Sequence, residues 1–256
     1  MTVREIYEII HGLAPFDTQE EWDNSGLLVG SGSGEVTCVL FALDATLPVI
    51  LEAEKCGAEL IVTHHPLMLS ARRRLTDEDY EGRVLQRLIR SGISLIAAHT
   101  SLDRAPGGMN DTLAQTIGLQ NIEGEGFIRA GDLPFPMSAA AFAEQLRLKL
   151  GDAVRLMGPE HAVVHRAGLC TGSGGGEWEE AARLGCDAFI SGEIKHHLAI
   201  AMAGSGIAAF ECGHFATELP GLLALAEALQ TRLNPLQCRV RIIRSALGGY
   251  DFSPKP

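Results

Sequence analysis

Two distant segments of this chain repeat one local pattern, and that repeat limits the folds available to it. Ala53–Thr63 aligns without gaps on Ala181–Ser191. Each segment has the end of a helix, a glycine that stops the helix, an acidic residue, and a short apolar run that ends on a hydroxyl side chain. Such apolar runs are typical of buried strands. The repeat therefore predicts a duplicated α/β unit; the alternative is a coincidence between two generic helix–turn–strand patterns.

The remaining segments fit an α/β chain of two similar domains. We expect the first domain to span residues 1–126 and the second 127–256, with the C-terminal strand, Val240–Ile243, able to pack back on the first. The glycine- and proline-rich segment 120–137 shows little periodicity and is the candidate connection between the domains. The other predicted strands are Val36–Leu43, Leu60–Thr63, Ile93–Ala98, Val163–Cys170, Ala188–Ser191 and Ile207–Cys212.

Composition and charge exclude several classes of protein. A hydrophobic content of 46% is typical of a globular chain, and no apolar run is long enough to span a membrane. The formal charge of −11 argues against non-specific binding to nucleic acid or to anionic membranes. The six cysteines show no C-x-x-C spacing, and the N-terminus lacks the pattern of a secretory signal. We therefore expect a cytoplasmic protein with reduced thiols.

Histidines and carboxylates follow the predicted strands at the points where the strands end. His64 and His65 come directly after Leu60–Thr63. In each half, another strand is followed by a histidine with an acidic residue four positions on: His99 with Asp103, and His214 with Glu218. Ligands of open α/β sheets bind at the carboxyl ends of the strands. A duplicated fold would bring the two sets of strand ends to face each other across one cleft.

Five of these residues form a plausible metal site: His64, His65, Asp103, His214 and Glu218. Three imidazoles and two carboxylates exceed what one tetrahedral ion needs, whereas two neighbouring ions can share bridging carboxylates. Asp103 and Glu218 are the natural bridges. Nitrogen and oxygen donors without thiolate favour Zn, Mn, Fe, Co or Ni over magnesium. The alternatives are local: the histidines could bond to backbone, Asp103 could cap a helix, and Glu218 could favour a helix N-terminus.

Other polar residues have weaker claims to a role. His99 is a candidate to orient a ligand or to carry a proton. His197, or its neighbour His196, is a candidate proton shuttle, with a solvated helix face as the alternative. Cys212 fits a buried structural thiol better than a ligand.

Two further motifs leave their function open. The glycine-rich run Thr171–Gly176 resembles an anion cradle, but it lacks the features of known phosphate loops, so a tight turn with close backbone approach is the stronger interpretation. Arg72–Arg74 are able to clamp a phosphate, although solvated surface or a subunit contact explains them as well.

Taken together, the motifs resemble the dinuclear-metal-centre family known as YbgI-like or GTP cyclohydrolase I type 2-like. The resemblance implies two interlinked α/β domains with a dinuclear site between them, a ring-shaped homohexamer, and metal ligands at the five positions chosen above. Glu193 stands where many relatives have aspartate, so its role is open. The matching motifs run nearly from end to end: Trp22–Gly30, Thr63–Pro66, Ala98–Asp103, Gly108–Asp111, Cys170–Gly174, Ser191–Glu193 and Gly213–Glu218.

The resemblance also implies a chemistry. The family name implies opening of the guanine ring of GTP, in which metal-bound hydroxide attacks C8; hydrolysis of another nucleotide would use the same residues. We therefore expect a hydrolase with two divalent transition-metal ions per subunit and a nucleotide substrate, with His99 and His197 as candidate catalytic groups. The alternative is a non-enzymatic hexameric scaffold or a regulatory protein that binds a partner.

Overall fold

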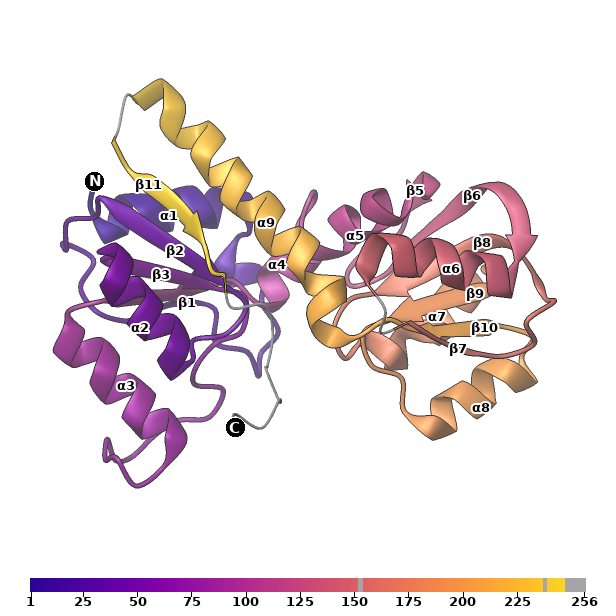
Figure 1. Cartoon of the computed structure of the whole chain (residues 1–256), viewed down its shortest axis with the longest axis horizontal. Helices are drawn as coiled ribbons and strands as arrows, with labels where there is room; N and C mark the ends of the chain where they lie inside the picture. Colours follow the sequence, from indigo (N-terminus) through magenta and orange to yellow (C-terminus); the bar gives the residue numbers. More distant parts are fainter. Residues whose placement is uncertain (152–153, 237–238, 247–256) are drawn as a thin grey trace. The chain divides into compact units, whose positions relative to one another are not determined.

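The computed structural model describes residues 1–151, 154–236 and 239–246, and the chain divides by contacts into two compact units (Figure 1). Unit 1 combines Met1–Ala105 with the chain from Leu222 onward, and unit 2 is Pro106–Gly221. Each unit is α/β, as predicted. The placing of a domain boundary between residues 126 and 127 stays a prediction.

Unit 1 is built on a five-stranded sheet in the order β1-β4-β3-β2-β11, counted over the described residues. Every residue of β2, β3 and β4 is buried, as expected of parallel strands covered on both faces. β1 is antiparallel to β4, and the other neighbours are parallel. The strands are β1 (Gly26–Val29), β2 (Cys38–Ala42), β3 (Leu60–Thr63), β4 (Ser94–Ala97) and β11 (Arg241–Arg244).

The helices of unit 1 begin and end where the sequence supplies caps. Thr2 and Glu5 form a capping box at the start of α1 (Val3–Leu13). Asp79 caps α3 (Tyr80–Ser91) by accepting from the amide of Gly82 at 2.7 Å. Left-handed glycines end both α3 and α2 (Leu47–Cys56). The short α4 (Thr100–Arg104) follows β4.

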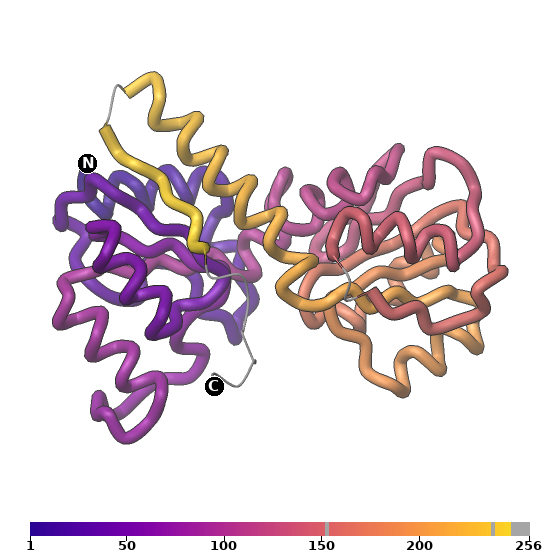
Figure 2. The backbone as a smooth tube through the Cα atoms, in the orientation of Figure 1, coloured from indigo at the N-terminus to yellow at the C-terminus, as the bar shows by residue number. Residues whose placement is uncertain are grey.

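The C-terminal strand joins the sheet of the N-terminal segment. β11, yellow in Figure 2, lies alongside the indigo strand β2, with Arg241 opposite Cys38 and Arg244 opposite Phe41. Residues from the two ends of the sequence therefore share one sheet.

Unit 2 contains a six-stranded sheet in the order β5-β6-β8-β9-β10-β7, again over the residues described. β8, β9 and β10 are parallel, and the other pairings are antiparallel. The strands are β5 (Gln120–Glu123), β6 (Arg129–Ser138), β7 (Arg155–Met157), β8 (Val163–Cys170), β9 (Ala188–Ser191) and β10 (Ala208–Glu211). The helices are α5 (Met109–Ile117), α6 (Ala139–Leu150), α7 (Trp178–Arg183), α8 (His196–Gly204) and α9 (His214–Leu233), which continues into unit 1.

The interpretation of 120–137 as an irregular connection is wrong, because β5 and most of β6 lie in it. The prolines that argued against a strand, Pro134 and Pro136, fall where the pairing of β6 with β8 shifts register, between Asp132 and Met137. An irregular stretch needs fewer ladder hydrogen bonds, so it tolerates residues that have no amide hydrogen.

The predicted duplication is confirmed by topology. The order β2-β3-β4-β1, with β1 antiparallel, recurs as β8-β9-β10-β7, with β7 antiparallel. A helix links the equivalent strands in both units: α2 and α3 in unit 1 correspond to α7 and α8 in unit 2.

The two histidine–carboxylate pairs are offset by one residue within the repeat. The last residues of β3 and β4 pair with each other, and so do the last residues of β9 and β10. The repeat matches β3 with β9, so β4 matches β10 residue for residue. Counting on from these strand ends, His214 is equivalent to Thr100, the first residue of α4, and not to His99. The shared spacing from histidine to carboxylate is therefore not inherited position by position.

Candidate metal centre

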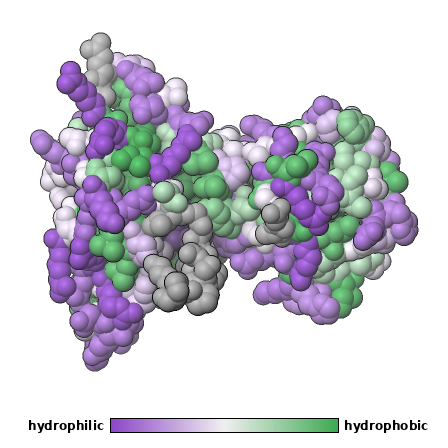
Figure 3. Space-filling model, viewed as in Figure 1, coloured by the Kyte–Doolittle hydropathy of each residue, from purple (hydrophilic) through white to green (hydrophobic). Residues whose placement is uncertain are grey.

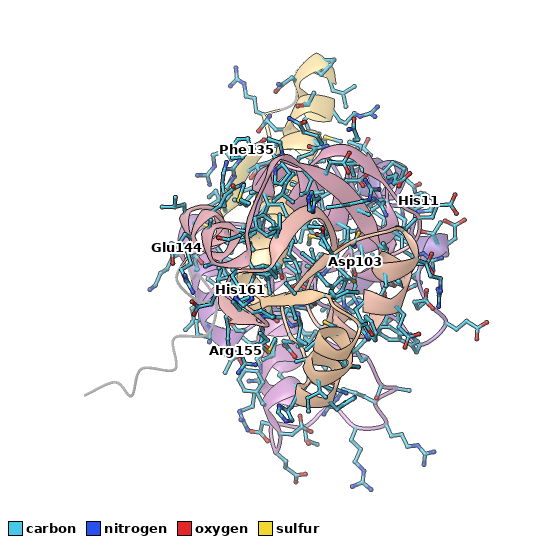
Figure 4. The ribbon with its side chains drawn as sticks, turned by 90° about the vertical axis from the view of Figure 1, so that its right-hand side faces the viewer. His11, Asp103, Phe135, Glu144, Arg155 and His161 are labelled. Carbon is cyan, nitrogen blue, oxygen red and sulfur yellow. The ribbon has the colours of Figure 1, made fainter. Side chains whose placement is uncertain are left out.

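Unit 1 gathers three imidazoles at the ends of two neighbouring parallel strands. His64 and His65 follow β3, and His99 follows β4. Their ring nitrogens include a set that all lie within 4.8 Å of one another. The ring centroid of His64 is 4.9 Å from that of His65 and 5.1 Å from that of His99. Asp103, labelled in Figure 4 and carried by α4, places Oδ1 3.6 Å from His64 Nε2.

The backbone and Asp44 fix two of these rings. Nδ1 of the fully buried His64 lies 2.8 Å from the carbonyl oxygen of Ala98, which accepts its hydrogen. His65 Nδ1 lies 2.9 Å from Asp44 Oδ1. An imidazole that donates from Nδ1 carries its lone pair on Nε2, so both rings present Nε2 as a ligand atom.

Asp23 holds the third ring and was not singled out from the sequence. Its Oδ1 lies 2.7 Å from His99 Nδ1, while Oδ2 accepts from the amide and hydroxyl of Thr100. The Asp23 side chain is fully buried. Burial raises the pKa of this carboxyl, but bonds from His99, Thr100 and the Asn24 amide outweigh burial and hold the pKa far below its ordinary value. An ionised Asp23 therefore fixes which nitrogen of His99 faces the cluster.

Trp22 stands beside this cluster with its ring open to solvent. Its centroid lies 5.9 Å from that of His99, at an interplanar angle of 78°. It is 59% exposed, whereas the other tryptophan, Trp178, is 8% exposed. An exposed indole placed edge-on to a candidate ligand leaves its face available to a planar molecule.

Unit 2 carries a second donor cluster at the start of α9. His214 Nε2 lies 3.0 Å from Oε1 of Glu218, one turn along the same helix and 4% exposed. His214 Nδ1 lies 2.6 Å from Glu193 Oε1, and the Ser173 hydroxyl donates to Glu193 Oε2 at 2.9 Å. The bonds from His214 and Ser173 hold the pKa of Glu193 below its ordinary value, against the effect of burial. Glu193 therefore does for His214 what Asp23 does for His99.

Two glycines make room for the donors of unit 2. Gly172 has φ of +58°, and a Cβ there would lie 2.2 Å from Glu218 Oε1 and 3.2 Å from His214 Nε2. A Cβ at Gly192 would lie 2.7 Å from the Cα of His214. The run Thr171–Gly176 thus serves close approach of backbone to side chains, the stronger of the two interpretations offered from the sequence.

The donor chemistry of both clusters fits a borderline divalent ion. Every candidate atom is an imidazole nitrogen or a carboxylate oxygen, the set that zinc, manganese and iron accept. The nearby thiol of Cys212 is fully buried, and burial raises its pKa to about 12, so it stays protonated. The prediction of Cys212 as a structural thiol agrees with this position.

Other predicted residues stand apart from these clusters. His197 is exposed on α8 and makes no hydrogen bond or ion pair with any residue that the structure describes, so its catalytic role stays a prediction. Arg72 is bound by Asp79 and Glu81. Histidines elsewhere have local roles or are exposed: His11, in Figure 4, accepts from the amide of Phe16, and His161 lies on the surface before β8.

Comparison with known proteins assigns the chain to a family. The model of the Duf34/NIF3 (NGG1p interacting factor 3) family matches residues 1–247. The chain belongs to this family. A Clostridium perfringens member described as a GTP cyclohydrolase 1 type 2 homolog is 33% identical over 244 residues, 91% of this chain and 93% of that protein. A Helicobacter pylori member described as GTP cyclohydrolase 1 type 2 is 31% identical, over 90% and 92% of the two chains.

Solved structures agree with this chain in fold. A Staphylococcus aureus protein superposes with a TM-score of 0.93 at 28% identity, covering 100% of this chain and 99% of that one. Reduced HcgD from Methanocaldococcus jannaschii gives a TM-score of 0.81 at 29% identity, over 95% and 97% of the chains. Within the described residues, no helix of this family member is long and apolar enough to span a membrane.

Proposed function

We propose that this chain is a dinuclear metal-dependent hydrolase acting on GTP or another nucleotide. His64, His65 and Asp103 of unit 1 and His214 and Glu218 of unit 2 would together hold two divalent transition-metal ions. The observation that carries the proposal is the convergence of His64, His65 and His99, each with Nδ1 engaged, at adjacent strand ends. The end of a buried strand does not require three oriented imidazoles for its stability, so a ligand-binding role explains them better.

Two bound ions would activate water at neutral pH and offset negative charge that develops on the substrate. A side chain of the protein would then carry the proton. Asp23 holds the Nδ1 hydrogen of His99, so His99 Nε2 is the atom able to take or give a proton. If His99 serves as a ligand instead, the same bond orients it.

Trp22 supports a planar heteroaromatic substrate. Its exposed ring lies against His99, and stacking of a base on an aromatic side chain contributes about 1–3 kcal/mol. Curated relatives described as GTP cyclohydrolase 1 type 2 favour guanine as that base. The net charge of −11 offers no general attraction for a triphosphate, so bound ions would supply it.

The test is turnover of GTP by protein loaded with zinc, manganese, iron, cobalt or nickel, followed by loss of the guanine H8 signal in proton spectra. Asp103→Asn and Glu218→Gln should abolish turnover, whereas His161→Ala, an exposed histidine, should leave it unchanged. Trp22→Ala should raise KM more than kcat, and Trp22→Phe should restore most of the loss. Absence of turnover with every metal and nucleotide tried would reject the enzyme.

The alternative, a metal-binding homohexameric scaffold or regulatory protein, makes the opposite prediction. The same two ligand variants would change oligomer mass or partner capture, with no catalytic signal to lose. Sedimentation of metal-loaded and metal-free protein separates the two functions.

A further inference from the structure

A cavity in unit 1 has no histidine in its lining and combines apolar walls with arginines. Its volume is about 460 Å³, within the range of small-molecule sites. The apolar walls come from the edge strand β1, from the segment after β3, and from one face of α3. They include Leu28, Met68, Leu75, Leu85 and Ile89.

The arginine run Arg72–Arg74 lines this cavity and also a second hollow of about 450 Å³ that includes Glu81. The three arginines differ in their pairing. Arg72 is bound at 2.7 Å by Asp79 and at 2.8 Å by Glu81, so its charge is offset and its guanidinium is held in place. Arg73 and Arg74 are exposed and form no ion pair with any other residue that the structure describes.

The acidic residues nearby are committed or lie outside the lining. Asp79 caps α3 and also binds Arg72. Glu81 binds Arg72 as well. Asp77 and Glu78 belong to the same segment but line neither cavity. The lining of the larger cavity therefore contains three cations and no carboxylate, in a chain with a formal charge of −11.

The apolar walls are left partly open to solvent. Leu75 is 48% exposed and Ile89 is 55% exposed, both beside the arginines. Figure 3 shows apolar side chains reaching the surface among hydrophilic ones over the region of α2 and α3. An apolar recess with unpaired cations on its lining suits a molecule with an apolar body and one anionic head.

We propose that this cavity is a binding site for a small amphipathic anion, with a carboxylate or phosphate head on Arg73 and Arg74 and an apolar body against Leu28, Leu85 and Ile89. A guanidinium binds either head through paired hydrogen bonds. Asn24 fixes the start of the arginine segment by donating to the carbonyl oxygen of Met68 at 2.7 Å. That bond ties the cavity wall to the turn that carries Trp22 and Asp23.

Calorimetric titration with octanoate tests the proposal, with octyl phosphate as the second head group and 1-octanol and octylammonium as matched controls of charge. Octanoate or octyl phosphate should bind once per chain. The two controls should bind at least about tenfold more weakly, because neither has an anionic head to accept charge-assisted hydrogen bonds from the guanidinium groups. Equal binding of octanoate, octanol and octylammonium would overturn the proposal.

Exposed positions allow variants that keep the fold. Ile89→Glu and Ile89→Lys place opposite charges at one half-exposed lining residue, so the first should abolish octanoate binding and the second should preserve or tighten it. Arg73→Gln with Arg74→Gln should weaken binding about tenfold, whereas Arg90→Gln, on α3 but outside the lining, should not. Equal affinities of the two Ile89 variants, or a change in oligomer mass in place of a change in affinity, would show that the cavity is not this site.

Discussion

The two donor clusters stand on matched scaffolds but use matched positions for opposite purposes. The residue after β3 and its neighbour are His64 and His65, and the equivalent residues after β9 are Gly192 and Glu193. In unit 1 this turn supplies two candidate ligands, and in unit 2 it supplies the carboxylate that orients His214. Two residues after the preceding strand, Asp44 of unit 1 orients His65, whereas Gly172 of unit 2 makes room for Glu218.

This difference shows what a duplicated α/β unit keeps and what it exchanges. Both copies keep a carboxylate bonded to Nδ1 of a histidine, so Nε2 is presented by the same physical means. In both units the polar side chains follow the ends of equivalent strands. The strand that carries the candidate ligand and the strand that carries its orienting partner differ between the two units. A second difference is burial, because the side chain of Asp23 is fully buried and that of Glu193 is 59% exposed.

The largest effect should follow removal of the buried candidate ligand His64 from unit 1. His64→Ala should lower affinity for zinc by more than about 100-fold, because loss of an orienting partner alone costs about 10- to 100-fold. It also leaves the buried carbonyl of Ala98 without its donor, at about 1–3 kcal/mol of stability. Metal analysis after dialysis against a graded chelator measures the affinity.

The matched control for this variant is His161→Ala, which removes an exposed imidazole and should change neither quantity. Added imidazole should restore part of the metal binding of His64→Ala by occupying the space left. Wild-type metal content in His64→Ala would contradict a ligand at this position.

The sequence was sufficient for the fold class and for the clustered histidines, because both depend on local patterns. Apolar runs that end at His64 and at His99, with glycine stops before each strand, carry that information within a few residues. Asp23 could not be found this way, since its partner His99 is 76 positions away. The only local signal was its place in the polar turn Trp22–Ser25.

The offset of one residue between the two histidine–carboxylate pairs could not be read from the sequence for a similar reason. Strand register fixes that offset, and it depends on hydrogen bonds between strands that spacing along the sequence does not record. For the same reason β6 could not be recognised from the sequence, because its prolines fall where its pairing with β8 shifts register.

The next effect in size should come from the buried carboxylate. Asp23→Asn keeps the shape but removes the charge that holds His99 Nδ1. With His99 as a proton carrier, turnover should fall about 10- to 100-fold, and with His99 as a ligand, metal affinity should fall by that factor. Stability of the metal-free protein at pH 7 should fall by about 1.5–3 kcal/mol, because the lost bonds involve a charged group. Urea unfolding of chelated protein measures it.

The pH dependence of that difference has a definite sign. The pKa of Asp23 is depressed in the folded protein, so its contribution is fully present above the unfolded value of about 3.9 and is lost as pH falls through the folded value. The stability gap between wild type and Asp23→Asn should therefore be constant near neutral pH and narrow below about pH 4. A gap that widens on acidification would contradict an ionised Asp23.

The smallest effect should come from the same chemical change in unit 2. Glu193→Gln retains an oxygen that accepts from His214 Nδ1 and loses only a charge that solvent already screens, since this side chain is 59% exposed. Zinc affinity should fall by less than about tenfold, and stability by at most about 0.5 kcal/mol. Asp23→Asn and Glu193→Gln therefore compare one chemical change, carboxylate to amide, at a buried and at an exposed partner of a histidine. Equal losses in the two variants would mean that His214 depends on the charge of Glu193 as strongly as His99 depends on Asp23, and that exposure does not distinguish the two clusters.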